Sequence, residues 1–130
     1  MIVADTNVLL YHYTSADFGK LTAALLAQDA DWHAPLLWRS EFRNGLATFM
    51  RAGYLHVKQS AQYFQHAALF MQGREHEPDA ARVLDLAAKS GCTAYDCEYV
   101  DLAERLAAPL ITADKKLIKA FPAICRALGT

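Results

Sequence analysis

The chain has 130 residues, of which 54% are apolar and 21% charged, a composition that excludes a disordered or low-complexity protein and fits one domain spanning residues 1–130. Lys and Arg total 13 against 14 Asp and Glu, so the net charge of −1 gives no bulk attraction to nucleic acid. The three cysteines are an odd number and lack C-x-x-C spacing, so neither a disulfide framework nor a zinc cluster is expected. This use of cysteine fits a reduced, cytoplasmic setting. No signal peptide or membrane span is expected, because there is no basic start and no long apolar run.

The first half of the chain predicts two strands and four helices. Residues 2–4 are short and apolar, as in a buried strand, and the next three residues, Asp5-Thr6-Asn7, are of types that cap a helix. Periodicity is clearest in the fourth helix, where apolar side chains recur every three or four positions. In chain order the elements are strand 2–4, helix 8–13, helix 17–28, strand 32–34, a helix opened by Pro35, and helix 57–72.

The second half predicts three helices and two strands. Pro78 and Asp79 open a helix that Gly91 ends, since glycine readily adopts the left-handed conformation of a helix C-terminus. Then follow helix 96–106, strand 109–112, helix 115–121 and an edge strand at 124–125. Short apolar strands separated by helices imply an α/β fold with a parallel sheet covered on both faces, in which ligands gather at the carboxyl ends of the strands.

Four carboxylates stand at positions of interest. Asp5 directly follows one predicted strand, Asp114 follows another by two residues, Asp96 begins a helix, and Glu41 lies in a helix otherwise rich in aromatics. Each alone has an ordinary explanation as a cap, a turn residue or a solvated side chain. Brought together they would repel one another and raise one another's pKa. Such a cluster makes sense around a hard divalent cation, and Mg²⁺ or Mn²⁺ suits carboxylate oxygens better than zinc does.

Four segments of the sequence resemble, in the right order, the PIN-domain family, and most closely the VapC-type ribonuclease toxins of type II toxin–antitoxin systems. They are 2–10 (IVADTNVLL), 40–44 (SEFRN), 94–99 (AYDCEY) and 110–117 (LITADKKL). The resemblance implies a three-layer α/β/α sandwich with a parallel central sheet and an acidic pocket that binds Mg²⁺ or Mn²⁺. Carried over by position, the catalytic and metal-binding residues are Asp5, Glu41, Asp96 and Asp114. Asn7 and Thr112 match supporting positions.

The activity that the resemblance implies is metal-dependent hydrolysis of RNA phosphodiester bonds by an endoribonuclease, leaving 5′-phosphate and 3′-hydroxyl ends. The implied partners are RNA and a cognate antitoxin protein, and the implied assembly is a homodimer. Arg43, Lys115 and Lys116 flank the predicted ligands and are expected to contact the RNA backbone, although a solvated helix face explains the two lysines equally well. The helices around residues 38–50 and 57–71 are expected to form a groove for an amphipathic antitoxin segment.

Two other functions remain open from the sequence. One is a stand-alone PIN nuclease that acts in RNA processing with the same metal pocket. The other is a non-catalytic interaction domain, either one that binds Mg²⁺ in its acidic pocket for signalling or one in which the carboxylates serve only as helix caps. Metal-dependent cleavage of RNA separates the nucleases from the interaction domain, and a short antitoxin gene just upstream separates the toxin from the stand-alone enzyme.

Overall fold

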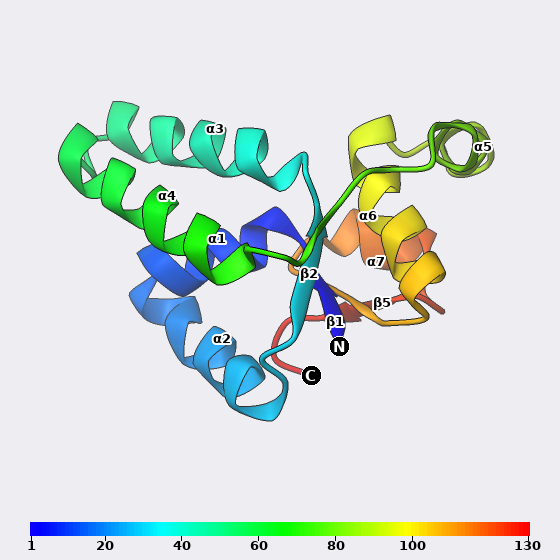
Figure 1. The fold of residues 1–130 in the computed structure, drawn as a ribbon, viewed down its shortest axis with the longest axis horizontal. Coiled ribbons are helices and arrows are strands. Elements are labelled where there is room, and N and C mark those ends of the chain that lie inside the picture. Colours follow the sequence, from blue (N-terminus) through cyan, green and yellow to red (C-terminus); the bar gives the residue numbers. More distant parts are fainter.

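A computed structural model describes all 130 residues as seven helices around a five-stranded sheet (Figure 1). In chain order the elements are β1 (Ile2–Ala4), α1 (Thr6–Thr14), α2 (Ala16–Gln28), β2 (Trp32–Pro35), α3 (Trp38–Arg51), α4 (Val57–Met71), β3 (Glu75–His76), α5 (Ala80–Ser90), α6 (Ala94–Leu106), β4 (Leu110–Thr112), α7 (Lys115–Ala120) and β5 (Cys125–Ala127). Gly91 ends α5 in the left-handed conformation, with φ 73°, as its position in the sequence predicts.

All five strands are parallel and lie in the order β3-β2-β1-β4-β5. The central strand β1 pairs on one side with β2, where Val3 stands opposite His33, and on the other with β4, where Val3 stands opposite Leu110. Because β2 and β4 leave β1 on opposite sides, the strand order reverses there, and a crevice opens at the carboxyl ends of β1 and β4. The residues that follow these two strands therefore meet.

The helices cover both faces of the sheet, which confirms the predicted three-layer α/β/α sandwich. In Figure 1, α1 to α4 lie on one side of the sheet and α5 to α7 on the other. Helix α4 packs against β2 on the first side, and α6 packs against β1, β2 and β4 on the second. Strand β1 is covered from both sides and is buried along its whole length, which explains its continuous apolar sequence.

Aromatic side chains fix α3 against α4. Trp38 and Phe42 are fully buried, as their shared helix face predicts, and they contact edge to face with ring centroids 5.6 Å apart. Trp38 also stacks on Phe64 of α4 at 5.8 Å. Burial of each large apolar side chain contributes roughly 1.5–3 kcal/mol, so this cluster holds α3 firmly and sets the position of Glu41 within it.

The structure corrects the prediction that Pro35 opens a helix. Pro35 is the last residue of β2, and α3 begins three residues later at Trp38. The neighbouring N–H groups of Ala34 and Leu36 donate to the carbonyls of Arg74, just before β3, and of His76 in β3. Position 35 faces the opposite side, toward β1, and β1 has already ended at this level. Proline is tolerated there because the N–H that it lacks has no strand partner to lose. The partner strand β3 has only two residues, and the sequence reading missed it.

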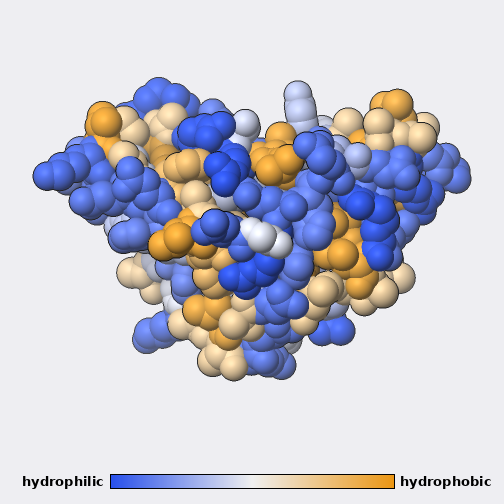
Figure 2. All heavy atoms as spheres, viewed as in Figure 1, coloured by the Kyte–Doolittle hydropathy of each residue, from blue (hydrophilic) through white to orange (hydrophobic).

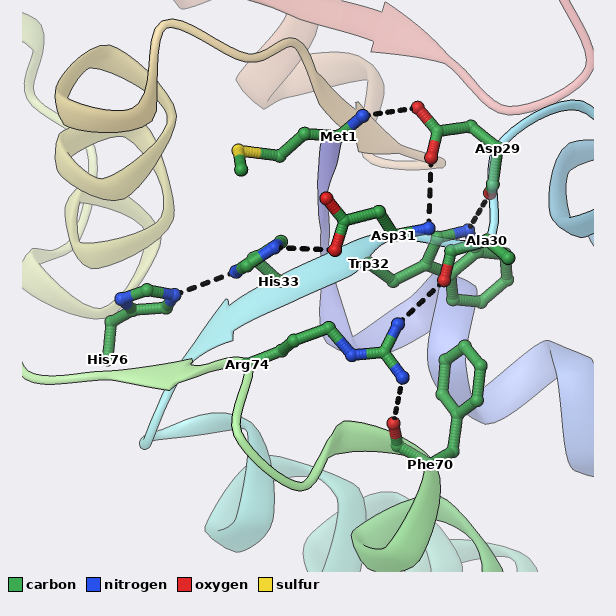
Figure 3. A network of polar contacts seen from close by, with 9 residues as sticks. All are labelled: Met1, Asp29, Ala30, Asp31, Trp32, His33, Phe70, Arg74 and His76. Atoms are coloured by element: carbon green, nitrogen blue, oxygen red, sulfur yellow. Dashed lines mark hydrogen bonds and ion pairs between the residues drawn. The ribbon is translucent and has the colours of Figure 1, made fainter.

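A polar network anchors the short edge strand β3 (Figure 3). His33 of β2 bonds to His76 of β3 between Nδ1 and Nε2 at 2.8 Å, and its Nε2 lies 2.8 Å from Oδ1 of Asp31. Just before β3, the guanidinium of Arg74 donates to the carbonyl of Ala30 at 2.7 Å. These contacts fasten both ends of β3 to the start of β2 and hold a strand too short to be stable on its own pairing.

The outer surface is mixed in character. On the face seen in Figure 2, hydrophobic side chains form separate patches among hydrophilic ones. None of the seven helices combines the length and the apolar character that crossing a membrane would require.

Candidate active site

An open pocket of about 560 Å³ lies at the carboxyl ends of β1 and β4, and all four carboxylates singled out in the sequence line it. Its walls come from α1, α3, α6 and the β4–α7 turn. The lining residues are Asp5, Thr6, Asn7, Leu10, Leu37, Ser40, Glu41, Asn44, Gly45, Tyr95, Asp96 and Asp114. The fold thus brings together carboxylates that are separated by up to 109 positions in the chain.

Asp5 is the most enclosed of these carboxylates, with 8% of its surface exposed. It caps α1 by accepting from the N–H of Thr6 at 2.8 Å, and its Oδ2 accepts from the hydroxyl of Thr112 at 2.6 Å. Burial raises the pKa of Asp5 to about 6; the Thr112 hydrogen bond opposes this shift, and the nearby carboxylate of Glu41 adds to it. Without a positive partner, the charged form of Asp5 is therefore costly in the folded chain.

Glu41 is oriented by two hydroxyl groups. Its Oε1 accepts from the hydroxyl of Tyr99 at 2.7 Å. The hydroxyl of Thr6 lies 2.9 Å from the same oxygen and within hydrogen-bond distance of the Tyr99 hydroxyl, and its single proton goes to one of the two. Burial, with Glu41 and Asp5 nearby, raises the pKa of Tyr99 well above its ordinary value, so its hydroxyl keeps the proton that it donates. The other oxygen, Oε2, takes no hydrogen bond from these two groups.

Thr6 and Tyr99 were not among the site residues predicted from the sequence. Tyr99 is one helical turn after Asp96, and Thr6 directly follows Asp5, so both could have been found by asking which polar residues share a face or a turn with the carboxylates. The inward face of the helix instead marked Tyr99 as a core residue, and the structure shows that it is both: its ring is buried and its hydroxyl reaches the pocket edge.

Asp96 and Asp114 stand at helix N-termini and face the same pocket. Asp96 is half-buried in the first turn of α6, which begins two residues earlier than predicted because Thr93 caps it, accepting from the Asp96 N–H at 3.1 Å. Burial raises the pKa of Asp96, and the neighbouring carboxylate of Asp114 adds to the shift. Asp114 caps α7 through Oδ1, which accepts from the N–H of Lys116 at 2.9 Å. Asp114 thus both caps α7 and lines the pocket.

Asn7 and Thr112 connect the two strand ends beneath these carboxylates. The side-chain amide of Asn7 lies 3.3 Å from Oδ2 of Asp5 and 3.4 Å from the hydroxyl of Thr112, and its carbonyl accepts from the N–H of Ala113 at 3.2 Å. The Thr112 hydroxyl also accepts from the N–H of Asp114 at 3.0 Å. Both side chains contact Asp5, and the Thr112 hydroxyl also holds the backbone of Asp114.

The chemistry of the donor set fits a hard divalent cation. Four carboxylates line the pocket, and no Lys, Arg or His side chain is among the lining residues to offset their charge. The side chains do not form a ready-made metal cluster, since no three His, Cys, Asp or Glu converge on one point. Asp5, Glu41 and Asp114 are each held by hydrogen bonds within the protein. An oxygen-only set of this kind suits a cation that keeps several of its own water molecules, as Mg²⁺ does.

None of the three predicted RNA-contacting residues lines the acidic pocket, and Arg43 instead lines the groove between α3 and α4. Arg43 is exposed on α3, with its guanidinium carbon 5.1 Å from the centroid of the Phe64 ring. Lys115 and Lys116 are exposed at the start of α7, and Lys116 is near enough to Asp96 to oppose the rise of its pKa. These positions are open to a polyanion that approaches the pocket from solvent.

Comparison with known proteins gives one family and two similar chains. The model of the PIN domain family matches residues 2–122. A protein of Pyrobaculum aerophilum named Ribonuclease VapC3 is 27% identical over 126 residues, which cover 95% of this chain and 96% of the relative. The crystal structure of PAE2754 from Pyrobaculum aerophilum superposes with a TM-score of 0.74 at 21% sequence identity, covering 98% of this chain and 90% of that one. The structural match supports the fold described above.

Proposed function

The chain belongs to the PIN domain family, and from this premise we propose that it is a Mg²⁺- or Mn²⁺-dependent endoribonuclease that hydrolyses RNA phosphodiester bonds. The observation that carries the proposal is the pocket itself: four carboxylates from four separate segments face one space that contains no basic side chain. Such a pocket repels a phosphate unless a cation lies between them. The name of the relative Ribonuclease VapC3 agrees with this activity.

In this mechanism the side chains of the protein hold the cation and orient the carboxylates around it, and none of them acts as a nucleophile. A divalent cation, when bound, supplies an activated water and neutralises charge on the scissile phosphate. Asp5, Asp96 and Asp114 would hold the cation by their oxygens. Thr112 keeps Oδ2 of Asp5 in one orientation, because a carboxylate that accepts a 2.6 Å hydrogen bond cannot rotate freely. Tyr99 acts in the same way on Oε1 of Glu41.

A nuclease assay tests the proposal directly. The purified chain is incubated with a defined single-stranded RNA in Mg²⁺, in Mn²⁺ and in excess chelator, and the ends of the products are sequenced. We expect cleavage only with cation, giving 5′-phosphate and 3′-hydroxyl ends, and no cleavage by an Asp5→Asn variant. Cation binding without any cleavage would instead support the non-catalytic interaction domain.

We extend the proposal to biological role: the chain is the toxin of a VapBC-type pair, it acts in the cytoplasm as a homodimer, and a cognate antitoxin binds it. An apolar groove of about 350 Å³ between α3 and α4 supports a helical partner. It is lined by Leu46, Met50, Val57 and Phe64 among others, and Val57 exposes 69% of its surface. An amphipathic antitoxin helix would cover these side chains.

Co-expression with the product of the upstream gene tests this role. We expect a complex that copurifies and that Val57→Glu disrupts. Leu84→Glu is the matched control, because Leu84 is similarly exposed, at 65%, but lies on α5 in the opposite helical layer. Failure to obtain any complex would favour the stand-alone nuclease, whose RNA cleavage would remain.

A further inference from the structure

One aromatic side chain stands unused at the rim of the acidic pocket. Tyr95, the second residue of α6, is the only aromatic among the twelve lining residues, and 62% of its surface is exposed. It belongs to none of the nine aromatic pairs of the protein. A large ring that faces water in this way contributes little to the stability of the fold.

The neighbouring tyrosine on the same helix shows the contrast. Tyr99, one turn later, exposes 1% of its surface, and its hydroxyl donates to Glu41. Packing and hydrogen bonding thus account fully for Tyr99 and leave Tyr95 unexplained. Exposure alone is not enough to mark a ligand contact, since Tyr54 is even more exposed, at 78%, but it lies outside the acidic pocket. What distinguishes Tyr95 is its position, directly beside Asp96 at the pocket edge.

We propose that Tyr95 is a stacking platform for one nucleobase beside the scissile phosphate. This inference rests on the proposed ribonuclease function and adds to it a residue that positions the substrate. Every base has a π-face that can stack on a tyrosine ring. A base inside a duplex is covered by its neighbours on both faces and is unavailable, whereas a base in a loop or single strand is free to stack.

The place of Tyr95 in the chain gives the stacking a function. Tyr95 and Asp96 line the same pocket, so a base held on Tyr95 keeps its own nucleotide near the carboxylate of Asp96. Stacking is tolerant of base identity. Tyr95 would therefore fix the register of the RNA strand over the carboxylates without selecting a particular sequence. It is a positioning residue, and its loss should act on binding more than on the chemical step.

Steady-state kinetics on a defined single-stranded RNA compare Tyr95→Ala, Tyr95→Phe and Tyr95→Trp with Tyr54→Ala as the matched control. We expect Tyr95→Ala to raise KM roughly tenfold, since base–aromatic stacking has about this effect on affinity, with a much smaller change in kcat. The Phe and Trp variants should retain the KM of the wild type because they keep a ring. Tyr54→Ala should leave both constants unchanged, and all four variants should melt at the wild-type temperature.

A double-mutant cycle identifies the base. Binding is measured with Mg²⁺ present, on RNA made uncleavable by a methylene group in place of the scissile ester oxygen, for oligonucleotides with one base removed at each position in turn. We expect one position next to the cleavage site at which base removal weakens the wild type, yet has no further effect on Tyr95→Ala. The wild type should bind the same RNA more weakly as a perfect duplex than as a single strand. Tyr95→Ala should bind the duplex and the single strand equally.

The outcomes separate the two proposals. If the wild type cleaves RNA and Tyr95→Ala matches it in KM and in binding, the stacking inference is wrong and the nuclease function stands. If the wild type binds RNA through Tyr95 but cleaves it neither with Mg²⁺ nor with Mn²⁺, the stacking stands and the nuclease function is wrong. A wild type that neither binds nor cleaves RNA overturns both.

Discussion

The hydroxyl of Thr112 lies 2.6 Å from Oδ2 of Asp5, and this hydrogen bond joins the ends of two neighbouring strands, β4 and β1. The same hydroxyl accepts from the backbone N–H of Asp114 at 3.0 Å. One small side chain thus links the carboxylate of Asp5 to the backbone of Asp114. The arrangement is possible because parallel strands end at the same edge of the sheet.

Replacing Thr112 tests this link. Thr112→Val removes one donor from the buried Asp5 carboxylate, and leaving a buried charged group less well satisfied should lower the free energy of unfolding by about 1–3 kcal/mol. The pKa of Asp5 should rise above its value of about 6, because the Thr112 hydrogen bond now lowers it. The acid limb of kcat/KM should then move to higher pH. Thr112→Ser, which keeps the hydroxyl, is the control and should resemble the wild type.

The stability of the cation-free protein should fall as pH rises through the range in which Asp5 ionises. Its pKa is raised from 3.8 to about 6 in the folded chain, so the folded state holds the proton more tightly than the unfolded state does. Between about pH 4 and pH 6 this difference should cost about 3 kcal/mol in the free energy of unfolding. Asp5→Asn lacks the charge, so at pH 7 in chelator it should be more stable than the wild type.

Thermal unfolding of both proteins from pH 4 to pH 8 measures the effect. The two curves should converge near pH 4, where Asp5 is protonated, and separate above it. Mg²⁺ or Mn²⁺ should raise the melting temperature of the wild type and have less effect on Asp5→Asn, since a bound cation relieves the repulsion. Parallel curves, with an equal cation response, would mean that Asp5 ionises freely and is not part of a cation site.

Two variants of Asp114 separate its cap role from its place in the pocket. Asp114→Asn keeps an oxygen that can accept from the first N–H groups of α7, whereas Asp114→Ala loses the cap at a cost of about 1 kcal/mol. Both variants should lose most of their turnover, because the charge on the oxygen is gone in each. Only the Ala variant should show a lower melting temperature. Normal turnover in Asp114→Asn would reduce Asp114 to a helix cap.

The lysines at the start of α7 are expected to act on RNA binding. Each of Lys115→Ala and Lys116→Ala should weaken binding modestly and reduce the slope of log affinity against log salt by about 0.7, the value for one contact to a single strand. Turnover at saturation should change little. Lys20→Ala, on the exposed surface of α2 and outside the pocket, is the control. A lysine variant with normal binding and lost turnover would show that the side chain stabilises the transition state instead.

The regular elements were largely predictable from the sequence because their signals are local. Residues 2–4 and 110–112 are short apolar runs, and the polar residues that follow them cap helices, as the structure confirms. The predictions were wrong for the elements whose structure depends on pairing with a neighbouring strand. Glu75 and His76 form a strand only because β2 lies beside them, and Pro35 ends a strand because its neighbours at 34 and 36 find partners there. No sequence pattern around Glu75–His76 or around Pro35 shows which strand lies beside it.

The sequence by itself determined that carboxylates would stand directly after buried strands and at helix starts, since the order of residues fixes which side chain follows which strand. Only the tertiary structure decided which of them meet. The sheet order places β4 beside β1, and this brings Asp114 to Asp5 across 109 positions. The hydroxyl contacts of Tyr99 with Thr6 and Glu41 arise in the same way. Such contacts depend on strand order and helix packing, which bury apolar surface across the whole chain, and no local stretch of sequence specifies them.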